Sequence, residues 1–133
     1  MVALKHAELT DQVIAAFFAV YNTLGYGFLE KVYENAMVIE LGRRGVVVLA
    51  QAPITVFYHG QAVGEYFADL LVADKVIVEL KAVKALAQEH EAQLLHYLRA
   101  TRIEVGLLLN FGPEPTFQRR AYDNPYKGRR ERE

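Results

Sequence analysis

Two carboxylates and a lysine, Asp69, Glu79 and Lys81, are the residues best suited to chemistry, and they lie in two apolar runs joined by a short polar turn. If the chain reverses over residues 73–75, antiparallel pairing places Asp69 directly opposite Glu79. Side chains alternate between the two faces of a strand, so Glu79 and Lys81 share a face. The three charged groups are therefore predicted to converge on one patch.

Paired carboxylates of this kind suit a divalent metal ion. Side chains directly opposite each other have Cβ atoms about 5 Å apart, where two carboxylates repel unless a cation lies between them. Mg²⁺ or Mn²⁺ would convert that repulsion into coordination. Lys81 would then steady a metal-bound water, or the negative charge that grows on a phosphoryl oxygen during attack. The alternative is a solvated charged stripe, although Asp69 and Glu79 each lie in an apolar run, where an unpaired charge is costly.

Two further pairs of residues are candidates for the same patch. Glu30 follows Gly27 at the start of a predicted helix, where stabilisation by the helix dipole alone would also explain it, and Tyr33 lies one turn further along the same face. Gln93 and Tyr97 are four residues apart in another predicted helix, where such a pair either anchors the core or binds a phosphate. The four histidines lack the spacing of metal ligands, which argues against a histidine-zinc site.

Two helices are predicted in the first third of the chain, because apolar residues recur there every three or four positions. The first helix begins at a cap formed by Thr10 or Asp11 and ends at Leu24, with Gly25 as its stop. The second contains residues 28–41 and ends in the glycine-containing segment that follows.

The rest of the chain is predicted to form strands with one helix between them. Runs of β-branched and aromatic residues indicate the strands, and Pro53 marks the first of them as an edge strand or a bulge. The predicted elements are, in order, a strand made of residues 46–49 and 54–58, strands 61–72 and 76–81, a helix over residues 88–100, and strands 105–110 and 116–122. The first three strands form an antiparallel meander, and strand 105–110 is apolar enough to be buried on both faces. The order predicts an α/β domain with a mixed sheet.

Composition narrows the class of protein. The chain has 133 residues, of which 53% are hydrophobic and 23% charged, as expected for one globular domain. We assign residues 1–122 to that domain and residues 123–133 to a charged, flexible tail. The absence of cysteine excludes thiol catalysis and disulfide scaffolds and fits a reducing cytoplasm. The apolar runs fall far short of the roughly 20 residues of a membrane-spanning helix, so we expect a cytoplasmic protein without a membrane partner.

The net charge of −1 gives no global field that would attract nucleic acid. Basic residues do gather between Gln118 and the C-terminus, either as a solvated end of the chain or as a phosphate-binding arm. A homodimer would provide the broader basic surface that a small nucleic-acid enzyme needs.

The segment from Gly27 to Tyr33 has the form G-x-x-E-x-x-Y. With Ala68-Asp69, Glu79-Leu-Lys81 and the spacing Q-x₃-Y, it makes the chain resemble the GxxExxY protein family, which is grouped with the PD-(D/E)XK nuclease-like superfamily. The resemblance covers about residues 10–120. It implies a restriction-endonuclease-like core, in which helices flank a mixed central sheet.

The resemblance also implies roles for individual residues. Asp69 and Glu79 correspond to metal ligands, and Lys81 to the catalytic lysine. Glu30 matches an acidic residue that many superfamily members supply from the first helix, as a further metal ligand or through water. The implied cofactor is Mg²⁺ or Mn²⁺.

Gln93 and Tyr97 match an element that helps to organise the site of RecB-type nucleases, and Tyr33 closes the G-x-x-E-x-x-Y motif as a further supporting residue. The sequence therefore predicts a metal-dependent nuclease acting on DNA or RNA. The alternative is a non-catalytic module of the same fold that binds nucleic acid or serves as an assembly partner.

Overall fold

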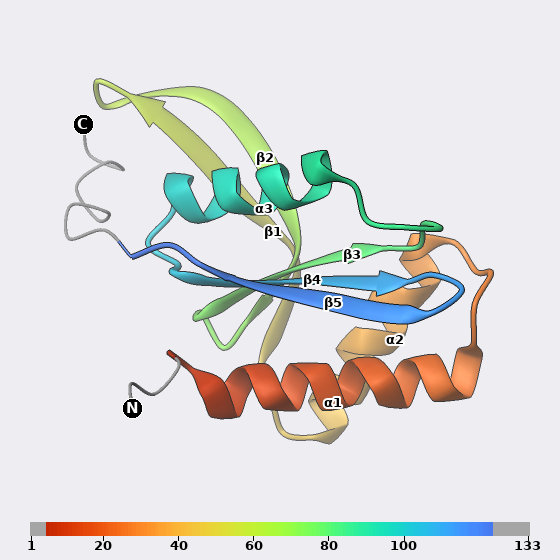
Figure 1. Ribbon diagram of the computed structural model, residues 1–133. Coiled ribbons are helices and arrows are strands. Elements are labelled where there is room, and N and C mark those ends of the chain that lie inside the picture. The colour runs from red at the N-terminus through yellow and green to blue at the C-terminus, as the bar shows by residue number, and fades with distance from the viewer. Residues whose placement is uncertain (1–4, 124–133) are drawn as a thin grey trace, which may run out of the picture.

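The computed structural model describes residues 5–123, so all of the predicted tail except Asp123 lies outside the described residues. A five-stranded sheet forms the centre, with helices against both of its faces (Figure 1). The elements are α1 (Ala7–Leu24), α2 (Glu30–Arg43), β1 (Val48–Tyr58), β2 (Gln61–Val72), β3 (Val76–Lys81), α3 (Gln88–Ala100), β4 (Val105–Phe111) and β5 (Pro115–Ala121). None of the described helices is long and apolar enough to cross a membrane.

The sheet is mixed, as the sequence predicted. Its strands follow the order β1-β2-β3-β4-β5, and every neighbouring pair is antiparallel except β3 and β4, which run parallel. A parallel pair needs a crossover connection, and α3 provides it. The predicted α/β fold class is confirmed.

Two hydrophobic cores lie on opposite faces of this sheet (Figure 1). α1 and α2 cover one face, where Phe17 and Met37 pack against residues such as Leu107, whereas α3 covers the other face and packs on Leu108. β4 is buried along its whole length, which fits the nearly continuous apolar run of residues 105–110, broken only by Asn110.

Both ends of α1 can be compared with the prediction. The predicted caps Thr10 and Asp11 are wrong, because the helix begins at Ala7 after a left-handed His6. Thr10 is instead buried inside the first turns, where its hydroxyl donates to the carbonyl oxygen of Ala7 at 3.1 Å. Gly25 does end the helix, with φ of 71° and its N–H donating to the carbonyl oxygen of Tyr21.

β1 is an edge strand that runs without a break through Pro53. A proline is tolerated there because an edge strand has one side without a ladder partner. The pairing of β1 with β2 shifts further along, between Val56 and Phe57, where Val63 of β2 is the extra residue.

Tyr33 fixes the connection between α1 and α2 to the sheet. Its fully buried ring stacks on Phe111 of β4, with ring centroids 4.3 Å apart. Its hydroxyl donates to the carbonyl oxygen of Gly25 at 2.6 Å and accepts from the N–H of Phe28 at 3.2 Å. One side chain therefore holds both ends of the α1–α2 turn.

Removing the hydroxyl in Tyr33→Phe leaves the two backbone groups without this partner, so we expect the free energy of unfolding in urea to fall by about 1–3 kcal/mol. Tyr33→Ala also removes the buried ring and should cost about 3–5 kcal/mol. Tyr26→Phe, in the same turn but 57% exposed, is the control and should leave stability unchanged. A Tyr33→Phe protein as stable as the wild type would contradict this role of the hydroxyl.

Candidate metal and active site

The β2–β3 hairpin has the register that the sequence predicted. Val72 pairs with Val76 and Leu70 with Val78, around a turn formed by residues 73–75. The regular ladder stops there, one position before Asp69 and Glu79 would meet. The two acidic residues therefore lie at the point where β2 and β3 part.

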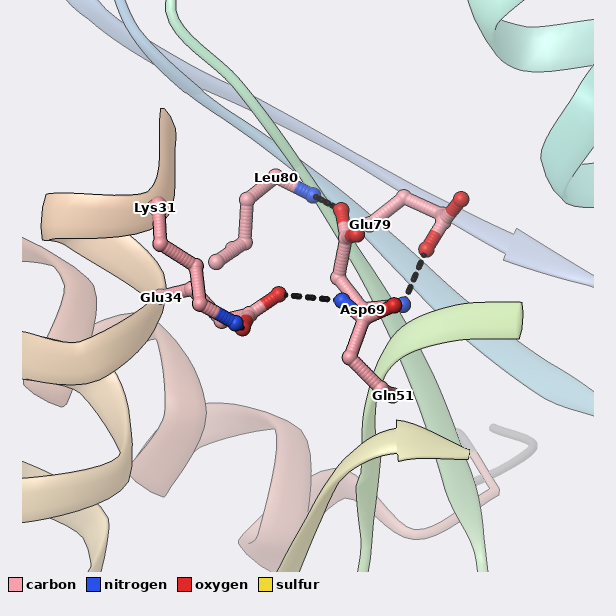
Figure 2. Close-up of polar contacts among 6 residues, drawn as sticks. All are labelled: Lys31, Glu34, Gln51, Asp69, Glu79 and Leu80. Atoms are coloured by element: carbon pink, nitrogen blue, oxygen red, sulfur yellow. Dashed lines mark hydrogen bonds and ion pairs between the residues drawn. The ribbon is translucent and has the colours of Figure 1, made fainter. Parts of the chain in front are cut away.

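At this point the two carboxylates take over the hydrogen bonding between the strands (Figure 2). Glu79 Oε2 accepts from the backbone N–H of Asp69 at 2.7 Å, and Asp69 Oδ2 accepts from the backbone N–H of Leu80 at 2.8 Å. Each side chain thus binds the backbone of the opposite strand. We refer to Asp69 and Glu79 as the acid pair.

At Asp69, the side chains of β2 that face one hydrophobic core give way to side chains that face the other core. Leu70 packs in the core with α1 and α2, whereas Ala68 packs in the core with α3, although residues two apart on a regular strand share a face. β1 makes the same change on either side of Gln51, which lies opposite Asp69 and has a left-handed φ of 54°. Asp69 of the acid pair therefore lies where β1 and β2 both bend.

Glu34 of α2 is a neighbour of the acid pair that sequence reasoning missed. It is only 4% exposed, accepts a hydrogen bond from Gln51 Nε2 at 2.6 Å and is paired with the ammonium group of Lys31 (Figure 2). Its position three residues before the buried Met37 places it on the inward face of the helix, and that spacing could have revealed it. A carboxylate on the buried face of a helix is uncommon unless it has partners.

The electrostatics of the acid pair favour a cation. Burial raises the pKa of Glu79 to about 8, and the negative charge of Asp69 adds to that effect. Burial also raises the pKa of Asp69, and the charge of Glu34 raises it further, against the opposing hydrogen bond from Leu80. A neutral Glu79, or two carboxylates joined by a metal ion, is therefore the favoured state.

The other residues predicted for the site differ in how close they lie to the acid pair. Lys81 is half-buried, and its positive charge lowers the pKa of both acids. Tyr97 has its pKa raised to about 12 by burial and by the charges of Glu79 and Asp69, and its hydroxyl accepts from Gln93 Nε2 at 3.1 Å. Lys81 and Tyr97 therefore interact electrostatically with the acid pair, and Gln93 contacts Tyr97.

Glu30 and Tyr33 stand further away from the acid pair. Glu30 is exposed in the first turn of α2, although its charge still raises the pKa of Glu79. Tyr33 is buried in the core and supports the site only through the α1–α2 turn. Within residues 5–123, no three histidine, cysteine or acidic side chains form a group that could hold a metal ion, so Glu30 is not gathered with the acid pair.

Asn110 fixes the chain just beyond Lys81. It is 1% exposed and lies beside Lys81 in the β3–β4 register. Its side chain accepts from the N–H of Val83 and donates to the carbonyl oxygen of the same residue, both at 3.0 Å. Gly112 lies against the same carbonyl, where a Cβ would overlap the oxygen. The backbone that carries Lys81 is therefore held at a defined position.

Comparison with known proteins identifies the family. The model of the PD-(D/E)XK nuclease superfamily matches residues 7–121, and the chain belongs to this superfamily, which indicates nuclease-like chemistry. The narrower GxxExxY family stays a prediction. Among solved structures, the one titled "Crystal structure of SSO0001" has the same fold, with a TM-score of 0.56 and 15% identity over 90% of this chain and 61% of that one. A search of curated proteins gave no match.

The contact at Gly112 can be tested by adding a single methyl group. Gly112→Ala should lower the free energy of unfolding by about 1–3 kcal/mol, because the Cβ displaces the carbonyl of Val83. Gly42→Ala is the matched control, since nothing lies within 4 Å of a Cβ there and alanine favours the helix by up to about 1 kcal/mol. Equal stability of the two variants in urea unfolding would show that the carbonyl of Val83 moves away from the added Cβ without cost.

The raised pKa of Glu79 makes stability depend on pH. The folded protein binds the proton more tightly than the unfolded chain, whose carboxyl has a pKa near 4.5, so stability falls as pH rises from there to about 8. The slope is at most about 1.4 kcal/mol per pH unit for this group. Glu79→Gln cannot ionise, and it should therefore raise Tm, relative to wild type and without metal, more at pH 8 than at about pH 5. An equal change at both values would contradict the shift.

Proposed function

We propose that the protein is a metal-dependent nuclease that hydrolyses phosphodiester bonds of nucleic acid. The observation that carries this proposal is the acid pair, two carboxylates that meet where β2 and β3 part, with Lys81 beside them on β3. Membership of the PD-(D/E)XK nuclease superfamily supports the same chemistry.

The donor set fits Mg²⁺ or Mn²⁺. Asp69 and Glu79 offer only carboxylate oxygens, which these ions prefer, and a divalent cation would offset the charge of Asp69, which adds to the effect of burial in raising the pKa of Glu79. Glu30, which is not gathered with the acid pair, would contribute only through bound water. The bound ion supplies Lewis acidity and a water of lowered pKa. Because ligand carboxyls must lose their protons, metal affinity should rise with pH.

The side chains around the acid pair have separate tasks. Lys81 stabilises negative charge on the phosphoryl oxygen, from a position fixed by Asn110. Tyr97 keeps its proton at neutral pH, since its pKa is about 12, so it acts as a hydrogen-bond donor and not as a base. Gln93 orients that hydroxyl. A homodimer and a cytoplasmic location stay predictions.

The proposal is tested with purified protein and labelled single- and double-stranded DNA and RNA, in Mn²⁺, Mg²⁺ or chelator. Cleavage should require metal, and Asp69→Asn, Glu79→Gln and Lys81→Met should each lower the rate by about 100-fold or more. Asp74→Asn and Lys75→Met remove the same charges from the exposed turn of the same hairpin. These two controls should cleave at the wild-type rate.

Two results would contradict the nuclease assignment. Cleavage by Glu79→Gln at the wild-type rate would show that the acid pair is not involved. No cleavage of any substrate by folded wild-type protein would favour the alternative, a non-catalytic module of the same fold that binds nucleic acid or assembles with a partner.

A further inference from the structure

A groove with a volume of about 700 Å³ lies between the outer half of the β1–β2 hairpin and α3. The hairpin extends past the other strands and curls over α3 (Figure 1). The groove is lined from the hairpin by Val56, Phe57 and Tyr66 and from α3 by residues that include Gln93, His96, Tyr97 and Arg99. Its size is that of a small-molecule binding site.

The register of the β1–β2 hairpin shifts at this groove. Val56 pairs with Gly64 and Phe57 with Ala62, so the extra residue is Val63 on β2. Bulges of this kind bend and twist the strand that carries them. Both Val56 and Phe57, which lie opposite the bulge, line the groove.

The groove shares a wall with the acid pair. Tyr97 lines it, and the same side chain lies close enough to Asp69 and Glu79 for their charges to act on it. Tyr66, three residues before Asp69 on β2, has its ring centroid 5.9 Å from that of Tyr97. A chain with a phosphate at the acid pair can therefore continue past Tyr97 into the groove.

The groove offers flat apolar surfaces together with a few polar groups. Phe57 and Tyr66 are 37% and 50% exposed, so their ring faces are accessible, and Tyr97 faces them from the helix. Gln93 supplies an amide that can hydrogen-bond a base edge, and the lining carries a positive charge at Arg99 and a negative one at Glu89. Aromatic rings beside a cationic group are the usual means of holding an unpaired base.

We propose that this groove binds an unpaired nucleobase of the strand to be cut, so that the substrate contains a single-stranded segment next to the scissile phosphate. The inference rests on the proposed nuclease function, whose substrate it narrows. In a duplex each base has neighbours on both faces, so no ring is free to stack on Phe57 or Tyr66. A peptide would need no phosphate site beside the groove, which makes it the weaker candidate.

The test measures binding and cleavage separately. Binding of a fluorescent oligothymidylate, and of the same strand in a duplex, is followed by anisotropy in chelator, where no metal-dependent cleavage occurs. Phe57→Ala and Tyr66→Ala should weaken binding of the single strand by about 5- to 100-fold each, because one stacked base is lost. Tyr66→Phe keeps the ring and should bind like the wild type.

Phe117→Ala is the matched control, since Phe117 is 41% exposed but lies on β5, at the opposite edge of the sheet. It should leave binding unchanged, and the Tm of every variant shows whether it is folded. In Mn²⁺ the wild type should cut the single strand, or a duplex with an overhang, faster than a blunt duplex, and the two groove variants should lose that preference.

The outcomes separate the two proposals. If the wild type cleaves but Phe57→Ala and Tyr66→Ala bind and cut the single strand as it does, the groove proposal is wrong and the nuclease stands. If cleavage is absent but binding of the single strand depends on both rings, the nuclease is wrong and the groove stands as a nucleic-acid site. Equal weakening by Phe117→Ala would also overturn the groove proposal.

Discussion

The exchange of hydrogen bonds between Asp69 and Glu79 is the interaction on which the site depends. Each carboxylate takes the place of a backbone carbonyl in the ladder, so β2 and β3 separate while remaining tied together. The separation leaves two acids in a largely apolar sheet interior, where Glu79 is only 3% exposed. Burying two carboxylates so close together is energetically unfavourable, and such groups are found mainly at functional sites.

The hairpin and the central strand could be predicted from the sequence because local rules fix them. A short polar turn sets the register of the strands that flank it, and a shift of one residue would move every apolar side chain to the wrong face. Asp69 and Glu79 could therefore be paired without a structure. Residues 105–110 could be assigned to the centre because a run that is apolar except at Asn110 is typical of a strand covered on both faces.

The features that could not be predicted depend on contacts between distant parts of the chain. Gln51 is left-handed because both strands bend there, and nothing in its neighbours in sequence requires it. Glu34 is buried because Lys31 and Gln51 satisfy its oxygens. The groove lies where the register of the β1–β2 hairpin shifts at Val63, and sequence patterns locate such shifts poorly.

The packing of α1 and α2 onto the sheet also affects the order in which parts of the chain can fold during synthesis. Tyr33 stacks on Phe111, and the hydroxyl of Tyr21 donates to the carbonyl oxygen of Gly112, 91 residues further along the chain. On the ribosome, the first third of the chain must therefore wait for the last strands before its core exists. The β2–β3 hairpin needs only a local turn, so its pairing does not depend on those last strands.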